Sequence, residues 1–416
     1  MTDVTRSRIS LRERTFSSFR NRAYRIYFGG MLGQMAAMNM QQIVGSLLIY
    51  RLTGSAAILG AMSFAGAIPM ILFSLFGGVI ADRLDKKKII IASQAAFGAV
   101  SLGVALLLTT GYLSPEHDGS WWVLVISSIF QGSVMGLGMP SRQAIVPEIV
   151  SEDQLMNAIS LNTMGMNVLQ LFAPAAAGFL VDAFNFEAVY YVMTAMYAIA
   201  VGFFCFLPSV RAASKVRVKA FEGIGKGLMY IRHNMNVLHV LLFTLVIVLL
   251  AMPYNNLMPI FVDDVLHVGA TGMGILMSLS GAGAMVGSIV LATLPSRRRG
   301  IMLAGSALVL GIALTAFAFS RSWPLSLGLI VIVGLGQTGR MTLSSTLVQS
   351  YVDNEYMGRV MSVFMMQFGF TSFSTFLAGM LAEGVGVQWA TGSFAIALTL
   401  VSILVIVFVP RIRRMQ

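Results

Sequence analysis

The sequence is poor in the residue types on which most catalytic and metal-binding proteins depend. Of its 416 residues, one is cysteine and four are histidine. Cys205 therefore has no partner for a disulfide within the chain, and the histidines are too far apart to form a metal-spaced pair on one helical face. No GxxxxGK[ST] segment offers a phosphate-binding loop for ATP. The sequence accordingly predicts neither an enzyme nor a metal or cofactor site.

Charge is also scarce. Charged residues make up 11% of the chain, whereas a soluble domain carries roughly 25%. Hydrophobic residues make up 57%, and the mean hydropathy is +0.81. Water is therefore not the main solvent of this chain. Because a membrane-spanning helix needs about 20 mostly apolar residues, a chain of this length has room for about twelve.

Twelve apolar runs of suitable length are present, which predicts an all-α membrane protein with the lipid bilayer as a partner. The spans are expected near residues 24–50, 56–81, 89–110, 121–141, 157–181, 187–208, 237–261, 270–293, 300–320, 323–343, 359–383 and 387–409. A polar, basic segment at 209–236 separates six spans in 1–208 from six in 237–416. That segment is either an amphipathic helix on the membrane surface or a simple linker.

The basic residues predict the orientation of the chain. Only Arg51 and Arg321, of 28 Lys and Arg residues, fall on one side of the expected spans, which leaves 26 on the other. Cytoplasmic loops collect Lys and Arg. Both termini are therefore expected in the cytoplasm, with the protein in a bacterial inner membrane, and the net charge of +11 needs no nucleic acid to explain it.

The two halves resemble each other in sequence. Glu152-Asp153-Gln154-Leu155-Met156 aligns with Asp353-Asn354-Glu355-Tyr356-Met357 at a shift of 201 residues. Paired six-helix repeats with a binding site between them are a known transporter architecture. The repeat therefore predicts two pseudo-symmetric six-helix bundles.

The segment between the second and third spans carries a recognisable motif. Gly78-Val79-Ile80-Ala81-Asp82-Arg83-Leu84-Asp85-Lys86-Lys87-Lys88 resembles the signature loop of the major facilitator superfamily, although that family usually has glycine at the place of Asp85. The resemblance implies the major facilitator fold and a secondary active transporter that works by alternating access. It also implies that Gly78, Asp82, Arg83, Lys86 and Lys87 belong to a loop that controls switching between states.

Two further segments narrow the resemblance. Met139-Pro140-Ser141-Arg142-Gln143-Ala144-Ile145-Val146-Pro147-Glu148 and the following Glu152–Ala158 segment are similar to the branch of bacterial macrolide-efflux and enterobactin-export proteins. In the fifth span, Pro174 and Gly178 match part of a glycine-rich exporter motif and are expected to serve helix packing. This resemblance implies efflux, typical of a multidrug antiporter, rather than uptake.

Polar residues inside the spans are candidates for substrate contact, because they are costly in a membrane unless they face a cavity or a partner. In the superfamily, the first, fourth, seventh and tenth helices line the central cavity. The resemblance therefore implies a lining by Gln34, Met38, Gln41, Gln131, Met135, Asn255, Asn256, Gln337 and Arg340. Hydrogen bonding between packed helices is the alternative for each amide.

The carboxylates lie near the ends of the expected spans. Proton coupling needs a group that titrates as the protein alternates, and Asp82, Glu148 and Glu383 are the candidates. Arg142 is the best candidate for a buried cation, and it is expected to pair with Asp82 or with Glu148.

The sequence thus predicts a monomeric transporter without a cofactor. Its expected activity is the export of a lipophilic or amphipathic small molecule, such as a drug or a siderophore-like compound, in exchange for protons. Uptake of a small metabolite is the alternative within transport. A membrane sensor or scaffold that transports nothing is the alternative of a different class.

Overall fold

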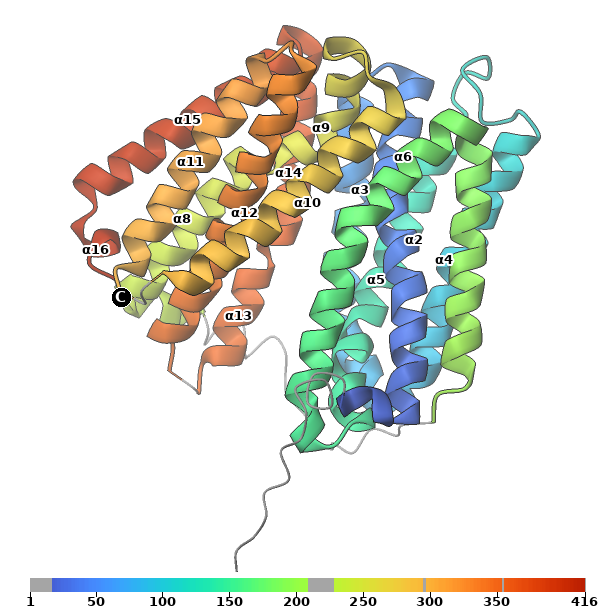
Figure 1. Ribbon diagram of the computed structural model, residues 1–416, viewed down its shortest axis with the longest axis horizontal. Coiled ribbons are helices and arrows are strands. Elements are labelled where there is room, and N and C mark those ends of the chain that lie inside the picture. The colour runs from blue at the N-terminus through green and yellow to red at the C-terminus, as the bar shows by residue number, and fades with distance from the viewer. Residues whose placement is uncertain (1–16, 209–227, 295–296, 354, 416) are drawn as a thin grey trace, which may run out of the picture.

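The computed structural model describes residues 17–208, 228–294, 297–353 and 355–415 (Figure 1). Every regular element in these ranges is a helix. Ten helices are long and apolar enough to cross a membrane, and one of them, Glu152–Cys205, contains two passes because Asn185 is not helical (φ 70°, ψ 177°). Arg22–Thr53, a 32-residue helix whose amides lower its hydropathy, adds another pass. The described ranges therefore make twelve passes, which confirms the predicted all-α membrane fold.

The first six passes form the N-terminal half. Its elements are η1 (Ser17–Arg20), α2 (Arg22–Thr53), α3 (Ala56–Arg83), α4 (Lys86–Thr109), α5 (Trp122–Ile149) and α6 (Glu152–Cys205). The side chain of Asn21 caps α2 by accepting hydrogen bonds from the N–H groups of Ala23 and Tyr24. Gly54 ends the helix with a φ of 62°, a conformation that favours glycine.

The other six passes form the C-terminal half. Its elements are α8 (Met235–Ala251), α9 (Pro253–Ile260), η2 (Phe261–Val265), α10 (Gly269–Thr293), α11 (Arg299–Phe319), α12 (Trp323–Tyr351), α13 (Met357–Met365), α14 (Gln367–Val385), α15 (Val387–Phe408) and α16 (Pro410–Arg413). Most of the predicted amphipathic segment, residues 209–227, lies outside the described residues, and 228–233 are helical.

Two helices continue eight residues past their expected ends. α5 continues to Ile149 and α12 to Tyr351, whereas the expected spans ended at residues 141 and 343. Hydropathy falls where a helix leaves the apolar core of the bilayer, but the backbone hydrogen bonds that hold the helix do not depend on that boundary. The apolar pattern therefore marks the end of the span and not the end of the helix.

Glycines allow the helices of each half to pack backbone against backbone. In the N-terminal half, a Cβ atom on Gly132 would overlap the carbonyl oxygen of Gly66, where α3 packs on α5. In the C-terminal half, a Cβ atom on Gly334 would overlap the carbonyl oxygen of Ser280, where α10 packs on α12. Small residues at such crossings give membrane helices the close contact on which their association depends.

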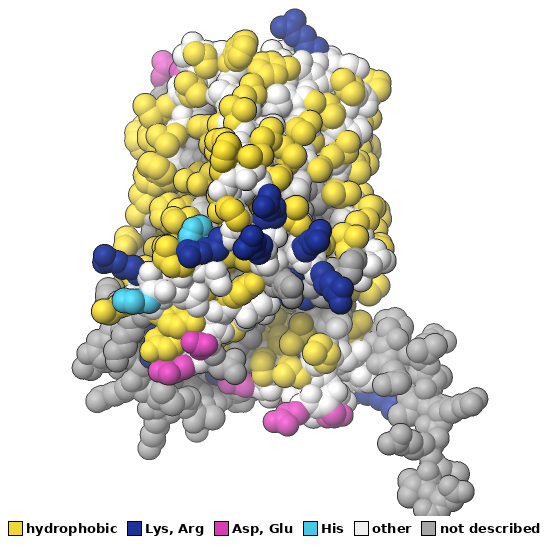
Figure 2. Space-filling model, turned by 90° about the vertical axis from the view of Figure 1, so that its left-hand side faces the viewer, with side chains coloured by type: hydrophobic (Ala, Val, Ile, Leu, Met, Phe, Trp, Pro, Cys, Tyr) yellow, Lys and Arg dark blue, Asp and Glu magenta, His cyan; other side chains and the backbone are white. Residues whose placement is uncertain are grey.

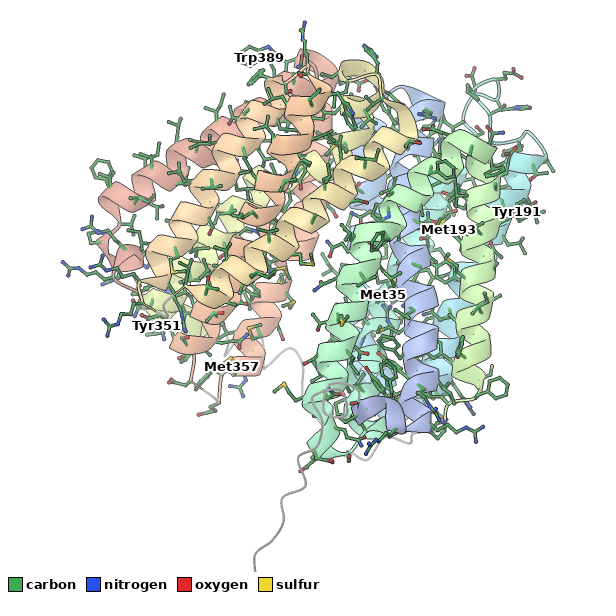
Figure 3. The ribbon with its side chains drawn as sticks, viewed as in Figure 1. Met35, Tyr191, Met193, Tyr351, Met357 and Trp389 are labelled. Atoms are coloured by element: carbon green, nitrogen blue, oxygen red, sulfur yellow. The ribbon has the colours of Figure 1, made fainter. Side chains whose placement is uncertain are left out.

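The two halves meet chiefly through two helix pairs, α6 with α10 and α3 with α14. Figure 1 shows that the halves lie together at the top of the view and diverge toward the bottom. We call the lower end the basic end, because it carries Lys86–Lys88, Arg297–Arg299 and Arg411–Arg414, and the upper end the opposite end. Figure 3 shows Trp389 at the opposite end, and Tyr351 and Met357 toward the basic end.

The surface of the C-terminal half has a large apolar region bordered by basic side chains, as expected of a membrane protein. Figure 2 shows hydrophobic side chains over most of this face and Lys and Arg side chains gathered in a band below them. On α15, Leu400, Leu404 and Val407 are each more than half exposed, and α16 follows with Arg411 and Arg413. Apolar exposure bordered by cations is typical of a surface that crosses from lipid into the cytoplasmic interface.

The glycine contacts generate a test of stability. We expect Gly132→Ala to destabilise the protein by about 1–3 kcal/mol, because the added methyl group forces α3 and α5 apart. Gly103→Ala is the matched control, since a Cβ atom there meets no other atom within 4 Å. The measurement is thermal unfolding of the purified protein. Equal melting temperatures for the two variants would contradict this account of the packing.

Candidate functional site: a polar cavity between the two halves

A cavity of about 560 Å³ lies between the halves, with α2 and α6 on one side and α9, α10 and α12 on the other. Its lining includes six amides, six hydroxyl groups and three methionines, and none of its lining residues is charged. The amides are Asn39, Gln42, Asn167, Gln170, Asn255 and Gln337. Because both halves contribute to the lining, the shape of the cavity depends on how the halves are placed.

Helical spacing brings these side chains to one face of each helix. On α6 the lining residues are Thr163, Asn167, Gln170, Leu171 and Pro174, and on α12 they are Gly334, Gln337, Thr338, Met341, Thr342 and Ser345. Residues three and four apart share a helical face. The lining extends from Pro174 and Gly334 toward Thr163 and Ser345, so the cavity extends from the middle of these helices toward the basic end.

Two of the nine predicted lining residues, Asn255 and Gln337, are among the lining residues of this cavity. Gln337 accepts a hydrogen bond from the Tyr254 hydroxyl group (3.1 Å). Tyr254 itself is 1% exposed, so α9 holds the Gln337 amide at the cavity wall.

The other predicted residues on α2 and α5 lie outside the lining of this cavity. Gln34 is 1% exposed, and its amide lies 3.6 Å from the sulfur of Met38. The Gln41 amide lies 3.5 Å from the Tyr190 hydroxyl group of α6. Gln131 and Met135 on α5 are half-buried. Contact of these five residues with substrate stays a prediction.

Asn256 and Arg340 make hydrogen bonds between helices, the alternative that the sequence left open. Asn256 donates to the Thr375 hydroxyl group of α14 (3.2 Å). Arg340 is 5% exposed and donates from Nη1 to Oε1 of Gln367 on α14 (3.2 Å). Both contacts stay within the C-terminal half.

Four cavity amides were absent from the predicted lining. Asn39 and Gln42 lie on α2, away from the Gln34–Met38–Gln41 stripe that faces the interior of the N-terminal half. Asn167 and Gln170 lie three residues apart on α6, facing α10. The spacing of these two amides on one face of the fifth span is a sequence signal for cavity lining. The resemblance to the superfamily instead implied a lining by the first, fourth, seventh and tenth helices.

The signature segment is described in part. The side chains of Asp82 and Arg83 and the surroundings of Gly78 lie outside what the structure describes. Asp85, which replaces the usual glycine, caps α4 by accepting a hydrogen bond from the Lys87 N–H group (3.0 Å). The Lys87 ammonium group donates to the carbonyl oxygen of Cys205 (2.8 Å). This segment therefore ties the start of α4 to the end of α6, and its control of switching stays a prediction.

The predicted pair between Arg142 and Glu148 is not formed. Glu148 instead pairs with Lys86 (Nζ to Oε1, 2.5 Å), and the Lys86 side chain is 6% exposed. Arg142 reaches the sulfur of Met38 on α2 (3.7 Å). The reason is geometric, because residues six apart on a helix, at 100° per residue, point in directions about 120° apart. Arg142 therefore faces α2 while Glu148 faces α4.

Four carboxylates accept hydrogen bonds that connect the two halves at the opposite end. Asp182 of α6 accepts hydrogen bonds from the N–H groups of Ala270 (3.3 Å) and Thr271 (2.7 Å) at the start of α10. Glu383 of α14 accepts from the Ala57 N–H group and the Ser55 hydroxyl group at the start of α3, both at 3.2 Å. A helix N-terminus carries a partial positive charge that favours such carboxylates.

The other two carboxylates, Asp263 and Asp264, accept hydrogen bonds from side chains at the end of α2. Arg51 donates from Nε and Nη2 to the two oxygens of Asp263 (2.9 and 3.0 Å), and the Tyr50 hydroxyl group donates to Asp264. Among the described residues, every hydrogen bond between the halves lies at this end.

The Asp182 and Glu383 contacts are equivalent under the internal repeat. The two residues lie 201 positions apart, which is the shift that relates the halves in sequence. Gly178 and Gly379 lie at the same shift, and a Cβ atom on either would overlap the carbonyl oxygen of Ala270 or Ala56, respectively. The predicted packing role of Gly178 is thus matched by a close contact in the structure.

A twelve-pass helical protein with a polar cavity between two related halves is a membrane transporter by architecture. The chain belongs to the Major Facilitator Superfamily, whose profile matches residues 26–375 and 296–415. This confirms the resemblance found in the signature segment. It also confirms that the chain is a transporter and not an enzyme.

Three of the similar proteins illustrate the branch. The chain is 24% identical to the staphyloferrin A transporter of Staphylococcus aureus over 80% of this chain and 83% of the relative. It is 22% identical to macrolide efflux protein A of Streptococcus pyogenes (80% and 82%) and 22% identical to the enterobactin exporter EntS of Escherichia coli (93% and 89%). These matches confirm the predicted branch. Among solved structures, the nucleoside transporter NupG superposes with a TM-score of 0.74 at 15% identity, over 93% of this chain and all of that one.

The contacts at the opposite end generate a test of gating. We expect Asp182→Ala combined with Glu383→Ala to shift the population toward states in which this end is open, by at least about tenfold, because each hydrogen bond to a charged group contributes roughly 1.5–3 kcal/mol and about 1.4 kcal/mol corresponds to tenfold. The measurement is labelling of a single cysteine at Gln42, in a Cys205→Ser background, by a membrane-impermeant maleimide added from the opposite side. Glu116→Ala combined with Asp118→Ala, two exposed loop carboxylates, is the matched control. Unchanged labelling would show that these contacts do not hold the end closed.

Proposed function

We propose that the protein exports an amphipathic small molecule across the bacterial cytoplasmic membrane by alternating access. The observation that carries this proposal is the cavity of about 560 Å³ between halves that are bonded together at the opposite end. A substrate bound there is shielded from the opposite end by the Asp182, Glu383 and Arg51 contacts. Breaking those contacts while the basic end closes would expose the same cavity to the other side.

Orientation follows from charge. The basic end faces the cytoplasm in this proposal, because Lys and Arg collect on the cytoplasmic side of membrane proteins. Both termini then lie in the cytoplasm, and the structure corresponds to an inward-facing state. One chain supplies both walls of the cavity, which supports a monomer as the working unit.

Export rather than uptake is supported by the names of the relatives. Two of the three are described as an efflux protein and an exporter. The cavity itself also suits amphipathic compounds, because it combines six amides with three methionines, whose flexible side chains adapt to varied ligand shapes.

Exchange for protons is the proposed source of energy. None of the lining residues titrates, so the proton would bind outside the cavity. Of the predicted candidates, Glu148 is paired with Lys86, whereas Glu383 accepts hydrogen bonds from α3 of the other half. A carboxylate whose partners separate as the halves move can bind a proton in one state and release it in the other. Glu383 is therefore our choice for the coupling residue.

The test is accumulation of a panel of dyes and macrolides in an efflux-deficient bacterium. We expect cells that express the protein to accumulate less of at least one compound, and a protonophore to abolish the difference. Asn255→Leu combined with Gln337→Leu should remove the effect, because both amides line the cavity. Gln143→Leu, at an exposed position of α5 outside the lining, is the control.

The outcomes separate the alternatives. Accumulation above that of cells without the protein, abolished by the same double variant, would show uptake instead of export. Export that survives the protonophore and Glu383→Gln would contradict proton coupling while leaving transport intact. A protein that is present in the membrane and changes the accumulation of no compound would count against the proposed class of substrate.

A further inference from the structure

The cavity lining is rich in hydrogen-bonding groups that are available to a ligand. Twelve of its 21 lining residues carry an amide or a hydroxyl group. Gln42, Asn167 and Gln170 are exposed to the cavity and make no side-chain hydrogen bond to another described residue. Each of these amides can donate and accept at once. Together they suit a ligand that presents several hydroxyl, ether or amide groups.

The same lining is unsuited to a ligand charge. The lining residues are all uncharged. The nearest cation along α12 is Arg340, which lies between two lining residues, Gln337 and Met341, but is 5% exposed and donates to Gln367. A buried charge without a paired charge is strongly disfavoured in an apolar environment. An ammonium or carboxylate group would therefore lose its water here without gaining a counter-charge.

A second, mostly apolar cavity of about 520 Å³ adjoins the first, and we call it the annex. It lies along α6 toward the basic end, where α6 and α10 diverge (Figure 1). Its lining residues are Ile159, Ser160, Thr163, Met164, Asn167, Val168, Leu171 and Met285.

The annex and the polar cavity are continuous. Thr163, Asn167, Leu171 and Met285 line both of them. Met164 is 60% exposed, and Val168 and Met285 are about half exposed. Apolar side chains exposed at the edge of a polar cavity offer a place for the apolar part of the same ligand, which would otherwise lie against amides.

We propose that the two cavities form one composite site for an amphiphile with an uncharged, oxygen-rich head. The head occupies the polar cavity, where it bonds with Gln42, Asn167 and Gln170. The apolar tail occupies the annex between α6 and α10. This inference deepens the proposed function by naming its substrate class, and it rests on that function in taking this cavity as the transport site.

The first experiment measures binding and not transport. The full-length protein is placed in phosphatidylcholine nanodiscs, and fluorescence polarisation is recorded for a fluorescently labelled dodecyl maltoside. We expect saturable binding. Probes with the same tail and label but a trimethylammonium or a carboxylate head should bind at least about tenfold more weakly, because their charge finds no partner in the lining. Unlabelled maltose, which lacks a tail, should not compete at concentrations where dodecyl maltoside does.

Variants locate the two parts of the ligand. Val168→Trp should weaken binding of the maltoside probe about tenfold or more by filling the annex. Met285→Trp, which fills the annex from α10, should have the same effect and serves if the first variant does not fold. Ile126→Trp is the matched control, because Ile126 is 62% exposed on α5 and lines neither cavity. Asn167→Leu should weaken binding of the maltoside more than binding of a probe in which the sugar is replaced by a single hydroxyl group.

The results distinguish this inference from the proposed function. Equal or tighter binding of a charged probe would overturn the inference, and for the carboxylate probe a loss of that binding in Arg340→Gln would show that an anion reaches Arg340. Binding that Val168→Trp and Met285→Trp both leave unchanged would also overturn it. Binding of the maltoside as expected, without any export in the cell assay, would instead support the composite site and contradict export.

Discussion

Asp182 and Glu383 each extend from the end of a membrane pass in one half to the backbone N–H groups that begin a helix in the other half. A carboxylate at a helix N-terminus satisfies donors that the helix itself leaves unpaired. Because the two contacts are related by the internal repeat, they hold both seams between the halves at the same end. The rest of the arrangement depends on this closure, since halves joined at the opposite end can separate only toward the basic end.

Glycine makes the same closure possible at the level of the backbone. One helical turn before each carboxylate, Gly178 and Gly379 let their helices approach a neighbouring backbone so closely that a methyl group would not fit. Lipid is as apolar as a leucine side chain, so helices in a membrane gain little from burying apolar surface against each other. Close packing and a few hydrogen bonds must therefore hold the helices together. Contacts of that kind can be exchanged for others as the halves move.

The placement of charge follows the cost of burying it. Lys86 and Glu148 pair near the basic end, and Arg51 and Asp263 pair at the opposite end, while the cavity between them is lined by amides and hydroxyl groups. Amides can be accommodated inside a membrane protein at lower cost than charges, provided they find partners. The two ion pairs therefore lie near the two ends, and the cavity lining offers a ligand hydrogen-bonding groups instead of charges.

The sequence by itself determined the twelve passes, the two related halves and the family, because hydropathy, repeat and signature motif are local or periodic properties of the chain. It also identified polar residues within the spans. Only the tertiary structure decided which of these polar faces meet. The Gln34–Met38–Gln41 stripe faces the interior of its own half while Asn39 and Gln42 reach the cavity, and Glu148 pairs with Lys86 instead of Arg142. Helical periodicity shows which residues share a face, but the rotation of that face toward a neighbour is decided by contacts with helices distant in sequence.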